Sequence, residues 1–334
     1  MSLEIMKSSC DAIHCSVIIV NWNSWGILSD CLEKLQSQTF ENFNVMVVDN
    51  ASDAPIPGDL IARYPDITLI QNQSNLGFAA ANNQAIKLLN DTEWVVLLNP
   101  DAFPEPDWLE QLIHAAEKNS GYAMFASRQL QDGNRNLLDG DGDVYHISGM
   151  VWRDGHGRPL NEADHAPREI FSPCAAAALY RRDVLLSVGG FDEDFFCYVE
   201  DVDLGFRLRL MGHRCLLVPN AVVHHIGSAT TGGQRSDFSV YHGHRNLVWT
   251  YVKNMPGWLF WAMLPLHIAM NWATICMFIV RGKGRVILRA KRDAIKGLPN
   301  MWARRKQIQA RRVATVRDIW QVLDKRLILR KNRR

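Results

Sequence analysis

Short apolar runs separated by helix-like segments are the feature that most restricts what this chain can fold into. The strand-like runs occupy residues 16–20, 43–48 and 94–98, with a weaker run at 67–70. Between them lie helix-like segments at residues 25–37 and 78–89. Strands that are apolar on both faces and alternate with amphipathic helices are typical of a parallel sheet covered on both sides. The pattern therefore predicts an α/β fold with a mainly parallel sheet.

Each of the three stronger runs ends in polar residues. Asn21 and Asn23 follow the first run, Asp49 follows the second, and Asn99-Pro100-Asp101 follows the third. Ligands of open α/β sheets bind beyond the carboxyl ends of the strands, so these residues mark the expected ligand-binding edge. The glycine fingerprint GxGxxG is absent after the first run, where the sequence is VNWNSWG, and this argues against nicotinamide chemistry.

The middle of the chain divides into an irregular stretch and a second structured stretch. Residues 121–157 are rich in Gly and Asp, and we expect surface loops and hairpins there. The Asp cluster is expected to be solvated, because the spacing and the closing Glu of an EF-hand are absent. Farther on, residues 175–180 and 215–218 predict strands, and residues 201–211 predict a helix closed by Gly212.

Acidic residues at strand ends and at one helix start are candidate functional groups. Asp49 is either a turn residue or an acceptor for the imide N–H of a uracil or thymine ring. Asp101 is either a turn residue or the ligand of a divalent cation that neutralises a diphosphate. Glu200 and Asp201 suit a helix N-terminus electrostatically. They also follow an aromatic cluster, and such surroundings raise the pKa of a carboxyl group, as a general base requires.

Two later segments offer further candidates. His224 and His225 end a predicted strand, and alternation along the strand places only one of them on the ligand side. That imidazole would complete a cation site begun by Asp101. Arg245 is either a phosphate clamp or a partner in a surface ion pair. It follows the Gly-rich residues 227–234, which we expect to form a mobile lid.

A series of segments occurs in a fixed order along the chain: SVIIVNWN, VVDNAS, NLGFAAANNQAI, LLNPDAF, GGFDEDFFCYVEDVDLGFRLRLMGHR, HHIGSAT and HRNLVWTYVKNMP. In these segments the chain resembles bacterial family 2 glycosyltransferases, most of all their rhamnosyltransferase-like branch. The resemblance implies the GT-A nucleotide-diphospho-sugar transferase fold and an inverting sugar transfer. It further implies dTDP-rhamnose as the best expected donor and a lipid-linked saccharide as acceptor, in cell-surface polysaccharide synthesis.

The resemblance also implies roles for single residues. Asp201 would be the general base that deprotonates the acceptor hydroxyl, with Glu200 as the reserve candidate. Asp101 takes the last position of the family's metal-binding DXD motif and His225 that of the C-terminal metal ligand, so Mg²⁺ or Mn²⁺ is the implied cofactor. The implied contacts to the nucleotide are Asn21, Asn23, Asp49, Asn75 and Gly77.

One departure from the family pattern keeps alternatives open. Asn99 stands where the DXD motif has its first acid. This substitution motivates the alternative of a non-catalytic membrane-bound adaptor that retains the fold, and a UDP-sugar-dependent transferase is a second alternative. Nucleotidylyltransferase activity is disfavoured, because no Gly-rich loop bearing Arg or Lys follows the first run.

The C-terminal part of the chain is apolar first and basic afterwards. Residues 257–280 carry no formal charge, and this segment is long enough to span a bilayer. Its residues Trp258, Trp261 and Trp272 suit a membrane interface. Residues 281–334 hold 19 Lys and Arg against 3 Asp and Glu. A buried helix pair is the alternative, but we expect a monotopic or re-entrant element on an anionic membrane surface rather than a nucleic-acid-binding tail.

The remaining features bound the organisation of the chain. Its 7 cysteines form no zinc-site spacing, and its first residues contain no apolar segment of signal-peptide length. We therefore expect reduced thiols and a location at the cytoplasmic face of the inner membrane. The expected parts are an N-terminal extension at 1–15, a catalytic domain at 16–255 and a helical, membrane-associating region at 256–334.

Overall fold

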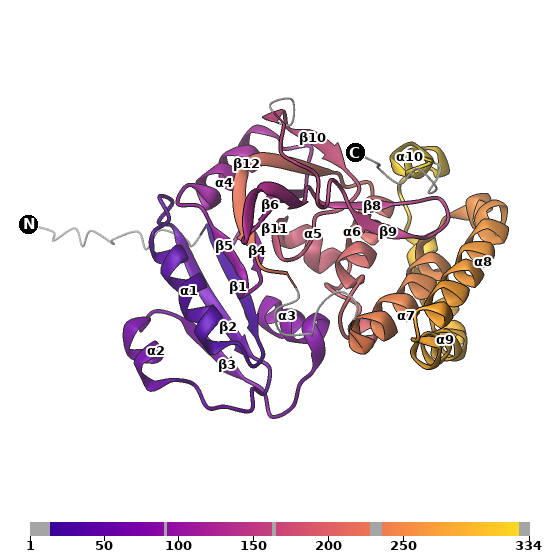
Figure 1. The fold of residues 1–334 in the computed structure, drawn as a ribbon. Coiled ribbons are helices and arrows are strands. Elements are labelled where there is room, and N and C mark those ends of the chain that lie inside the picture. The colour runs from indigo at the N-terminus through magenta and orange to yellow at the C-terminus, as the bar shows by residue number, and fades with distance from the viewer. Residues whose placement is uncertain (1–13, 90–91, 162–164, 228–235, 327–334) are drawn as a thin grey trace, which may run out of the picture.

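The fold alternates strands and helices in its first third and ends in a group of helices (Figure 1). The computed structural model describes residues 14–89, 92–161, 165–227 and 236–326. The strands are β1 (Cys15–Asn21), β2 (Phe43–Asp49), β3 (Thr68–Gln71), β4 (Trp94–Leu98), β5 (Ala102–Pro104), β6 (Met124–Gln131), β7 (Asn134–Gly140), β8 (Asp143–Tyr145), β9 (Val151–Arg153), β10 (Arg168–Ile170), β11 (Ala177–Arg181) and β12 (Cys215–His225). The helices are α1 (Trp25–Gln36), α2 (Gly58–Arg63), α3 (Gly77–Leu88), α4 (Trp108–Lys118), α5 (Arg182–Ser187), α6 (Glu200–Leu210), α7 (Asp237–Asn254), α8 (Gly257–Val280), α9 (Gly284–Ala310) and α10 (Val316–Val322).

One mixed sheet forms the centre of the molecule, in the order β10-β12-β6-β11-β4-β1-β2-β3. The pairs β1–β2, β1–β4, β2–β3 and β12–β6 are parallel, whereas β11 runs antiparallel to both β4 and β6. The predicted α/β fold with a mainly parallel sheet is confirmed. The strands predicted at 215–218 and near 221–223 are parts of one strand, β12, whose register shifts between Val218 and Val222.

Alternation along the strands builds a core on each face of the sheet. Val17 and Ile19 of β1 pack in the core beneath α1 and α4, whereas Ile18 packs in the core beneath α3, α5 and α6. Both β1 faces are apolar because both are covered, which is why its sequence lacks the alternation of a half-exposed strand.

The C-terminal helices share a third core with α6. Leu204 and Leu208 of α6 face the sheet, while Val202, Phe206 and Leu210 face the core of α7 to α10. Helix α6 is therefore enclosed between the sheet and the C-terminal helices, which lie opposite α1 and α2 in Figure 1. This position explains why almost all of its residues are buried.

For residues 121–157 the expected hairpins are present, as β6–β7 and β8–β9, but the expectation of solvated surface loops is wrong. This stretch contributes β6, which lies inside the sheet between β11 and β12. The Asp cluster is buried: Asp139, Asp141 and Asp143 are 4%, 1% and 6% exposed. Arg128 of β6, itself 1% exposed, pairs with Asp141 at 2.9 Å. This charged pair is buried because of tertiary contacts, so the polar composition of the stretch does not predict its burial.

A buried ion pair joins α6 to α7 and gives a stability prediction. Lys253 is 1% exposed, and its Nζ lies 2.8 Å from Asp203 Oδ2 and also bonds to Asp192. Removing one partner leaves buried charge uncompensated, so Lys253→Met should lower the free energy of unfolding by about 3–5 kcal/mol in urea titrations. The matched control is Lys283→Met, whose partner Asp237 is largely exposed and whose loss should cost at most about 1 kcal/mol. Equal effects of the two substitutions would contradict the assignment.

Candidate functional site

A cavity of about 580 Å³ lies at the carboxyl ends of the parallel strands. Trp22 and Ser24 follow β1, Asn50 follows β2, and the Asn99-Pro100-Asp101 turn follows β4. Opposite walls come from the β8–β9 hairpin, the segment before β11, the start of α6, the end of β12 and the start of α7. The ligand-binding edge predicted from the strand ends is therefore where a cavity is found.

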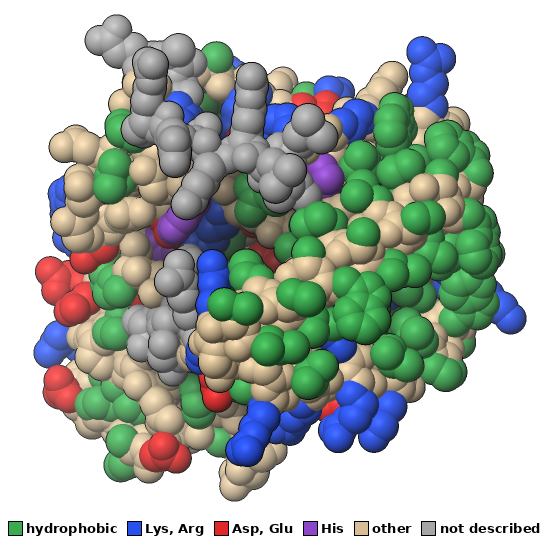
Figure 2. Space-filling model, turned by 45° about the vertical axis from the view of Figure 1, so that its right-hand side comes forward, with side chains coloured by type: hydrophobic (Ala, Val, Ile, Leu, Met, Phe, Trp, Pro, Cys, Tyr) green, Lys and Arg blue, Asp and Glu red, His purple; other side chains and the backbone are tan. Residues whose placement is uncertain are grey.

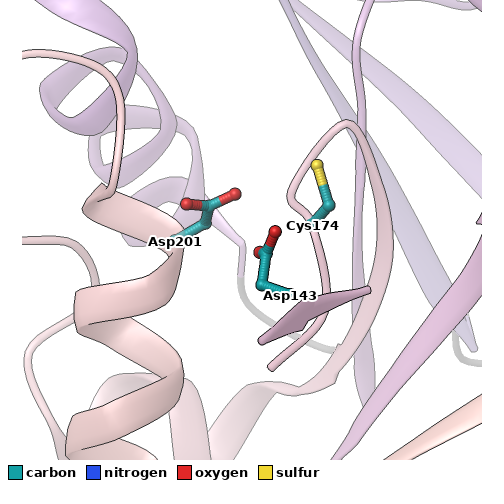
Figure 3. Close-up of side chains that lie close together, drawn as sticks. All are labelled: Asp143, Cys174 and Asp201. Atoms are coloured by element: carbon teal, nitrogen blue, oxygen red, sulfur yellow. The ribbon is translucent and has the colours of Figure 1, made fainter. Parts of the chain in front are cut away.

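Two carboxyl groups and a thiol meet at one wall of this cavity (Figure 3). Asp201 points from α6 towards Asp143 of β8 and towards Cys174, which precedes β11, and the possible ligand atoms of the three lie within 4.8 Å of one another. The Asp201 carboxylate accepts hydrogen bonds from the backbone N–H groups of Ala175 at 3.1 Å and Val202 at 2.8 Å. These bonds fix the orientation of the carboxylate in the wall.

Burial changes the acidity of the carboxyl groups at this wall. It raises the pKa of Asp201, although the backbone N–H bonds oppose the effect. It raises the pKa of Asp143 and of Glu200 well above the usual range, and the charge of Asp201 raises both further. Asp143 Oδ2 and Glu200 Oε2 are buried without a hydrogen-bond partner among the described residues. The wall thus presents carboxyl groups that hold a proton more readily than ordinary carboxyl groups, as a general base requires.

The third acid of the α6 start has a different role. Asp203 is fully buried and does not line the cavity. It accepts hydrogen bonds from Arg207 at 2.8 Å, Lys253 at 2.8 Å and Asn254 at 2.7 Å. Of the acids in the sequence EDVD, Glu200 and Asp201 face the cavity, and Asp203 binds α6 to its neighbours.

Asp101 and His225 face each other at a second wall. His225 Nε2 lies 3.3 Å from Asp101 Oδ1, and Nδ1 donates to Asp139 Oδ2 at 2.7 Å. Burial lowers the pKa of His225, but hydrogen bonding to Asp101 and Asp139 outweighs it and raises the pKa. Strand alternation turns His224 away, towards Glu105 at 2.6 Å, so one imidazole of the pair faces the cavity, as predicted.

The Asp101–His225 pair suits a divalent cation better than the Asp143–Cys174–Asp201 group does. An imidazole whose other nitrogen bonds to a carboxylate is the usual arrangement of a histidine ligand, and Asp139 supplies that carboxylate. At the other wall, one of the three possible ligands is the Cys174 thiol, whose pKa burial raises to about 12. Mg²⁺ and Mn²⁺ prefer oxygen and imidazole ligands to a thiol. The metal role of Asp101 and His225 stays a prediction that this geometry supports.

Asn75 and Gly77 line the cavity beside a residue that the sequence did not single out. Asn50 donates to Asn75 Oδ1 at 2.9 Å and accepts from the backbone N–H of Leu76 at 3.0 Å. Gly77 has a φ of +83°, and a Cβ there would lie 2.6 Å from the Phe196 carbonyl oxygen. Asn50 therefore shapes the turn that carries the two predicted nucleotide contacts.

The other predicted nucleotide contacts lie next to the cavity rather than in its wall. Asp49 accepts from Ser52 Oγ at 2.6 Å and from Asn21 Nδ2 at 3.4 Å. Asn23 exchanges hydrogen bonds with Asp53 at 2.7 and 3.0 Å. None of Asp49, Asn21 and Asn23 is among the lining residues, and their base-binding roles stay predictions.

Arg245 lies outside the lining residues, where it supports the loop before α6. Its guanidinium donates to the backbone carbonyls of Asp194 at 3.1 Å and Phe195 at 2.8 Å and lies 4.3 Å from the ring centre of Trp249. A phosphate-clamp role for Arg245 stays a prediction, and it requires the guanidinium to leave these contacts and bind phosphate oxygens instead. The lid predicted at 227–234 lies, except for Gly227, outside the described residues.

The neighbouring Asn246 holds a strained loop in place. Phe196, Tyr198 and Val199 have φ values of 66°, 64° and 70°, a region that costs about 1–3 kcal/mol for each such residue. The amide nitrogen of the fully buried Asn246 lies within 2.7–3.0 Å of three backbone carbonyls of this loop, those of Phe195, Cys197 and Tyr198. Asn246 thereby maintains the backbone that places Glu200 and Asp201 at the cavity.

Sequence reasoning missed several residues of the site. They are Trp22, Asn50, Asp139, Asp143, Arg153, Cys174 and Asn246. Asp139, Asp141 and Asp143 belong to β7, to the turn after it and to β8, so no single strand pattern marks them in the sequence. Asn246 carries no local signal, because the carbonyls that it contacts belong to residues distant in the sequence.

The first comparison with known proteins concerns sequence. The family model described as Glycosyl transferase family 2 matches residues 16–189. An N-acetylglucosaminyl-diphospho-decaprenol L-rhamnosyltransferase of Mycobacterium tuberculosis is 28% identical over 259 residues, covering 68% of this chain and 80% of the relative. A pre-mycofactocin glycosyltransferase of the same organism is 30% identical over 190 residues, covering 56% and 38%.

The second comparison concerns structure. A mannosyltransferase from Pyrobaculum calidifontis in complex with GDP-Man and Mn²⁺ aligns over 92% of this chain and 87% of its own, with 17% identity and a TM-score of 0.54. GalNAc-T7 with UDP, GalNAc and Mn²⁺ aligns over 73% of this chain with 15% identity and a TM-score of 0.59. This chain spans 48% of the GalNAc-T7 chain. At these identities the likeness concerns the fold, and it confirms a GT-A-like architecture.

The two adjacent histidines provide a matched test of the cation site. His225→Ala should weaken Mn²⁺ binding at least about tenfold, since it removes a ligand, whereas His224→Ala should leave it unchanged, since that ring faces Glu105. Titration of Mn²⁺ monitored by electron paramagnetic resonance measures both. Unchanged binding in His225→Ala would remove this pair as the cation site.

Proposed function

The chain belongs to glycosyl transferase family 2, and on this basis we propose that it transfers rhamnose from dTDP-rhamnose to a lipid-linked saccharide with inversion. The chain is a nucleotide-sugar-dependent glycosyltransferase. The donor, the acceptor and a role in cell-surface polysaccharide synthesis are the finer part of the proposal. The similarity to the Mycobacterium tuberculosis N-acetylglucosaminyl-diphospho-decaprenol L-rhamnosyltransferase supports this choice.

One observation carries the proposal. The same cavity of about 580 Å³ is lined by Asp201, a half-buried carboxyl group of raised pKa, and by the Asp101–His225 pair. Transfer from a nucleotide sugar needs a base for the acceptor hydroxyl and a means to stabilise the departing diphosphate. The two walls offer groups suited to these two tasks.

Asp201 is the proposed base. As its carboxylate accepts the proton of the acceptor hydroxyl, that oxygen forms a bond to the anomeric carbon. The bond from this carbon to the diphosphate oxygen breaks on the opposite face, and the electron pair leaves with the nucleotide diphosphate. The N–H groups of Ala175 and Val202 hold the carboxylate during the transfer.

Asp101 and His225 are the proposed ligands of Mg²⁺ or Mn²⁺. When bound, the cation would neutralise charge on the diphosphate leaving group. Asp139 orients the His225 ring by accepting from Nδ1. The structures of two similar transferases, the Pyrobaculum calidifontis mannosyltransferase and GalNAc-T7, contain Mn²⁺, which supports a divalent cation here.

The proposed nucleotide contacts and surroundings complete the assignment. Asn75 and Gly77 line the cavity, and the further proposed contacts to the nucleotide are Asn21, Asn23, Asp49 and Arg245. We place the enzyme at the cytoplasmic face of the inner membrane, as a peripheral or monotopic protein on anionic lipid. Helix α8 supports this location, because it is long and apolar and only 17% of its most apolar 18-residue segment is buried.

Asp201→Asn tests the catalytic assignment. Transfer from dTDP-rhamnose should fall by roughly 10²–10⁴-fold, because an amide cannot accept the proton. The dissociation constant for the nucleotide diphosphate should be unchanged, and Glu200→Gln should lower transfer less than Asp201→Asn does. Product mass measures transfer, and calorimetry measures binding.

Other outcomes of this assay would favour the alternative functions. Retained transfer in Asp201→Asn would remove this residue as the base. Transfer only from UDP-sugars would overturn the donor. Nucleotide binding without turnover of any donor by the unaltered protein would favour a non-catalytic adaptor.

The raised pKa of Asp201 predicts a pH dependence. The base must be unprotonated, so kcat/KM should rise with pH and reach half its maximum above the ordinary aspartate pKa of about 3.9. Nucleotide-diphosphate binding measured over the same pH range separates loss of the base from loss of binding. A profile that stays flat down to that pKa would contradict a base of raised pKa.

A further inference from the structure

Helix α8 has its polar side chains turned towards the protein. His267, 5% exposed, donates from Nδ1 to the Ser148 carbonyl at 2.7 Å and stacks on Tyr251 with ring centroids 4.0 Å apart. Asn271 donates to the His267 carbonyl at 2.8 Å, and Thr274 is 5% exposed. A helix facing water places its polar side outwards. The opposite arrangement of α8 indicates that its outer side faces an apolar medium.

The outer side of α8 is aromatic and aliphatic. Trp258, Trp261 and Trp272 are 60%, 63% and 64% exposed. Further members of the same side are Ile268, Met277, Ile279 and Val280, with Cys276 exposed among them. A continuous exposed surface of large apolar side chains marks an interaction site. Tryptophan in particular suits the interface of a membrane.

Helix α9 extends this surface. Leu288, Ile295 and Trp302 recur every seven residues and are 52%, 64% and 38% exposed. Trp302 contacts Trp261 of α8, with ring centroids 6.4 Å apart, so the two apolar sides meet. Figure 2 shows them as one broad green area, bordered below by Lys and Arg side chains. We call these residues of α8 and α9 the apolar face.

The charges beside the apolar face are mainly basic. Residues 257–292 contain no Asp or Glu. The exposed basic residues at 281–296 are Arg281, Arg285, Arg289, Arg292 and Lys296. Asp293 is the one acid in this range, and it pairs with Arg289 and Arg292. An apolar surface with a basic border complements an anionic bilayer, in which the apolar side chains enter the headgroup boundary and the cations meet lipid phosphates.

The contacts of α8 also restrict how it can meet a membrane. Lys291 of α9 donates to the carbonyl of His244 in α7 at 2.7 Å and also bonds to Asn271 of α8. A spanning α8 would draw these partners and the basic residues of α9 into hydrocarbon, which is unfavourable. We propose that α8 and α9 form one docking face that lies in the plane of an anionic bilayer, with α8 immersed on one side and crossing nothing.

This arrangement rests on the proposed function and deepens it, because it sets the orientation of the cavity. Helix α7 packs against α9 and against α6, and Phe238 and Ser239 near its start line the cavity. Asn246 of α7 holds the loop before Asp201. The docking face and the catalytic wall are thus connected by one helix, which presents the cavity to acceptors anchored in the same bilayer.

Vesicle binding by the full chain tests the proposal. Sedimentation with vesicles of phosphatidylcholine and phosphatidylglycerol should show at least about tenfold stronger binding than with phosphatidylcholine alone. Replacing Trp258, Trp261 and Trp272 together with serine should weaken binding at least about tenfold. The control, Ile61→Ser with Leu88→Ser, removes apolar residues that are 51% and 55% exposed elsewhere and should change nothing.

Two further measurements separate docking from spanning and from self-association. Vesicles should protect Cys276 from a maleimide reagent, as measured by peptide mass mapping, and alkaline carbonate should release the protein. Retention after carbonate would overturn the in-plane arrangement. Equal vesicle binding by the tryptophan variant, or a dimer without lipid that this variant dissociates, would overturn the docking face. Unchanged nucleotide-diphosphate binding shows that the variant is folded, and it keeps this result separate from the test of transfer.

Discussion

The buried ion pair between Asp203 of α6 and Lys253 of α7 is the interaction on which the site depends. Helix α6 carries the cavity-facing acids at its start, and its position requires a fixed neighbour on the side away from the sheet. Asp203 is fully buried and receives Lys253, Arg207 and Asn254. Charge buried to this degree is tolerated only where partners satisfy it, so the pair fixes the two helices against each other.

The same helix pair explains how strain is sustained beside the cavity. Three residues before α6 have left-handed backbone angles, and the amide of Asn246 bonds to the carbonyls of that loop. Strained backbone persists only where surrounding structure determines it. The loop directs Glu200 and Asp201 towards the strand ends, where Asp101 and His225 lie. The sheet and the helical region thus contribute opposite walls of one site.

Much of this architecture could be predicted from the sequence, because its signals are local. The runs ending at Asn21, Asp49 and Asn99 are covered parallel strands, and both the hydrophobic pattern and the polar ends reveal them. The alternation at His224 and His225 follows from strand geometry and was confirmed. These features can be predicted from residues that are neighbours in the sequence.

The remainder depends on contacts between distant residues. Asp139, Asp141 and Asp143 resemble a solvated loop in sequence, yet they bond to His225, pair with Arg128 and face Asp201, respectively. Likewise His267 and Asn271 are polar residues within the apolar sequence of α8, and the fold places them against Ser148 and Lys291. Composition describes what a segment contains, whereas only the fold determines which side of it is covered.

The position of a bound cation tests the central claim most directly, because two acidic walls compete for it. Crystals grown with Mn²⁺ and dTDP can be measured at a wavelength where manganese scatters anomalously. The account predicts an anomalous peak between Asp101 Oδ1 and His225 Nε2, leaving Asp201 free to act as base. A peak between Asp143 and Asp201 instead would contradict it.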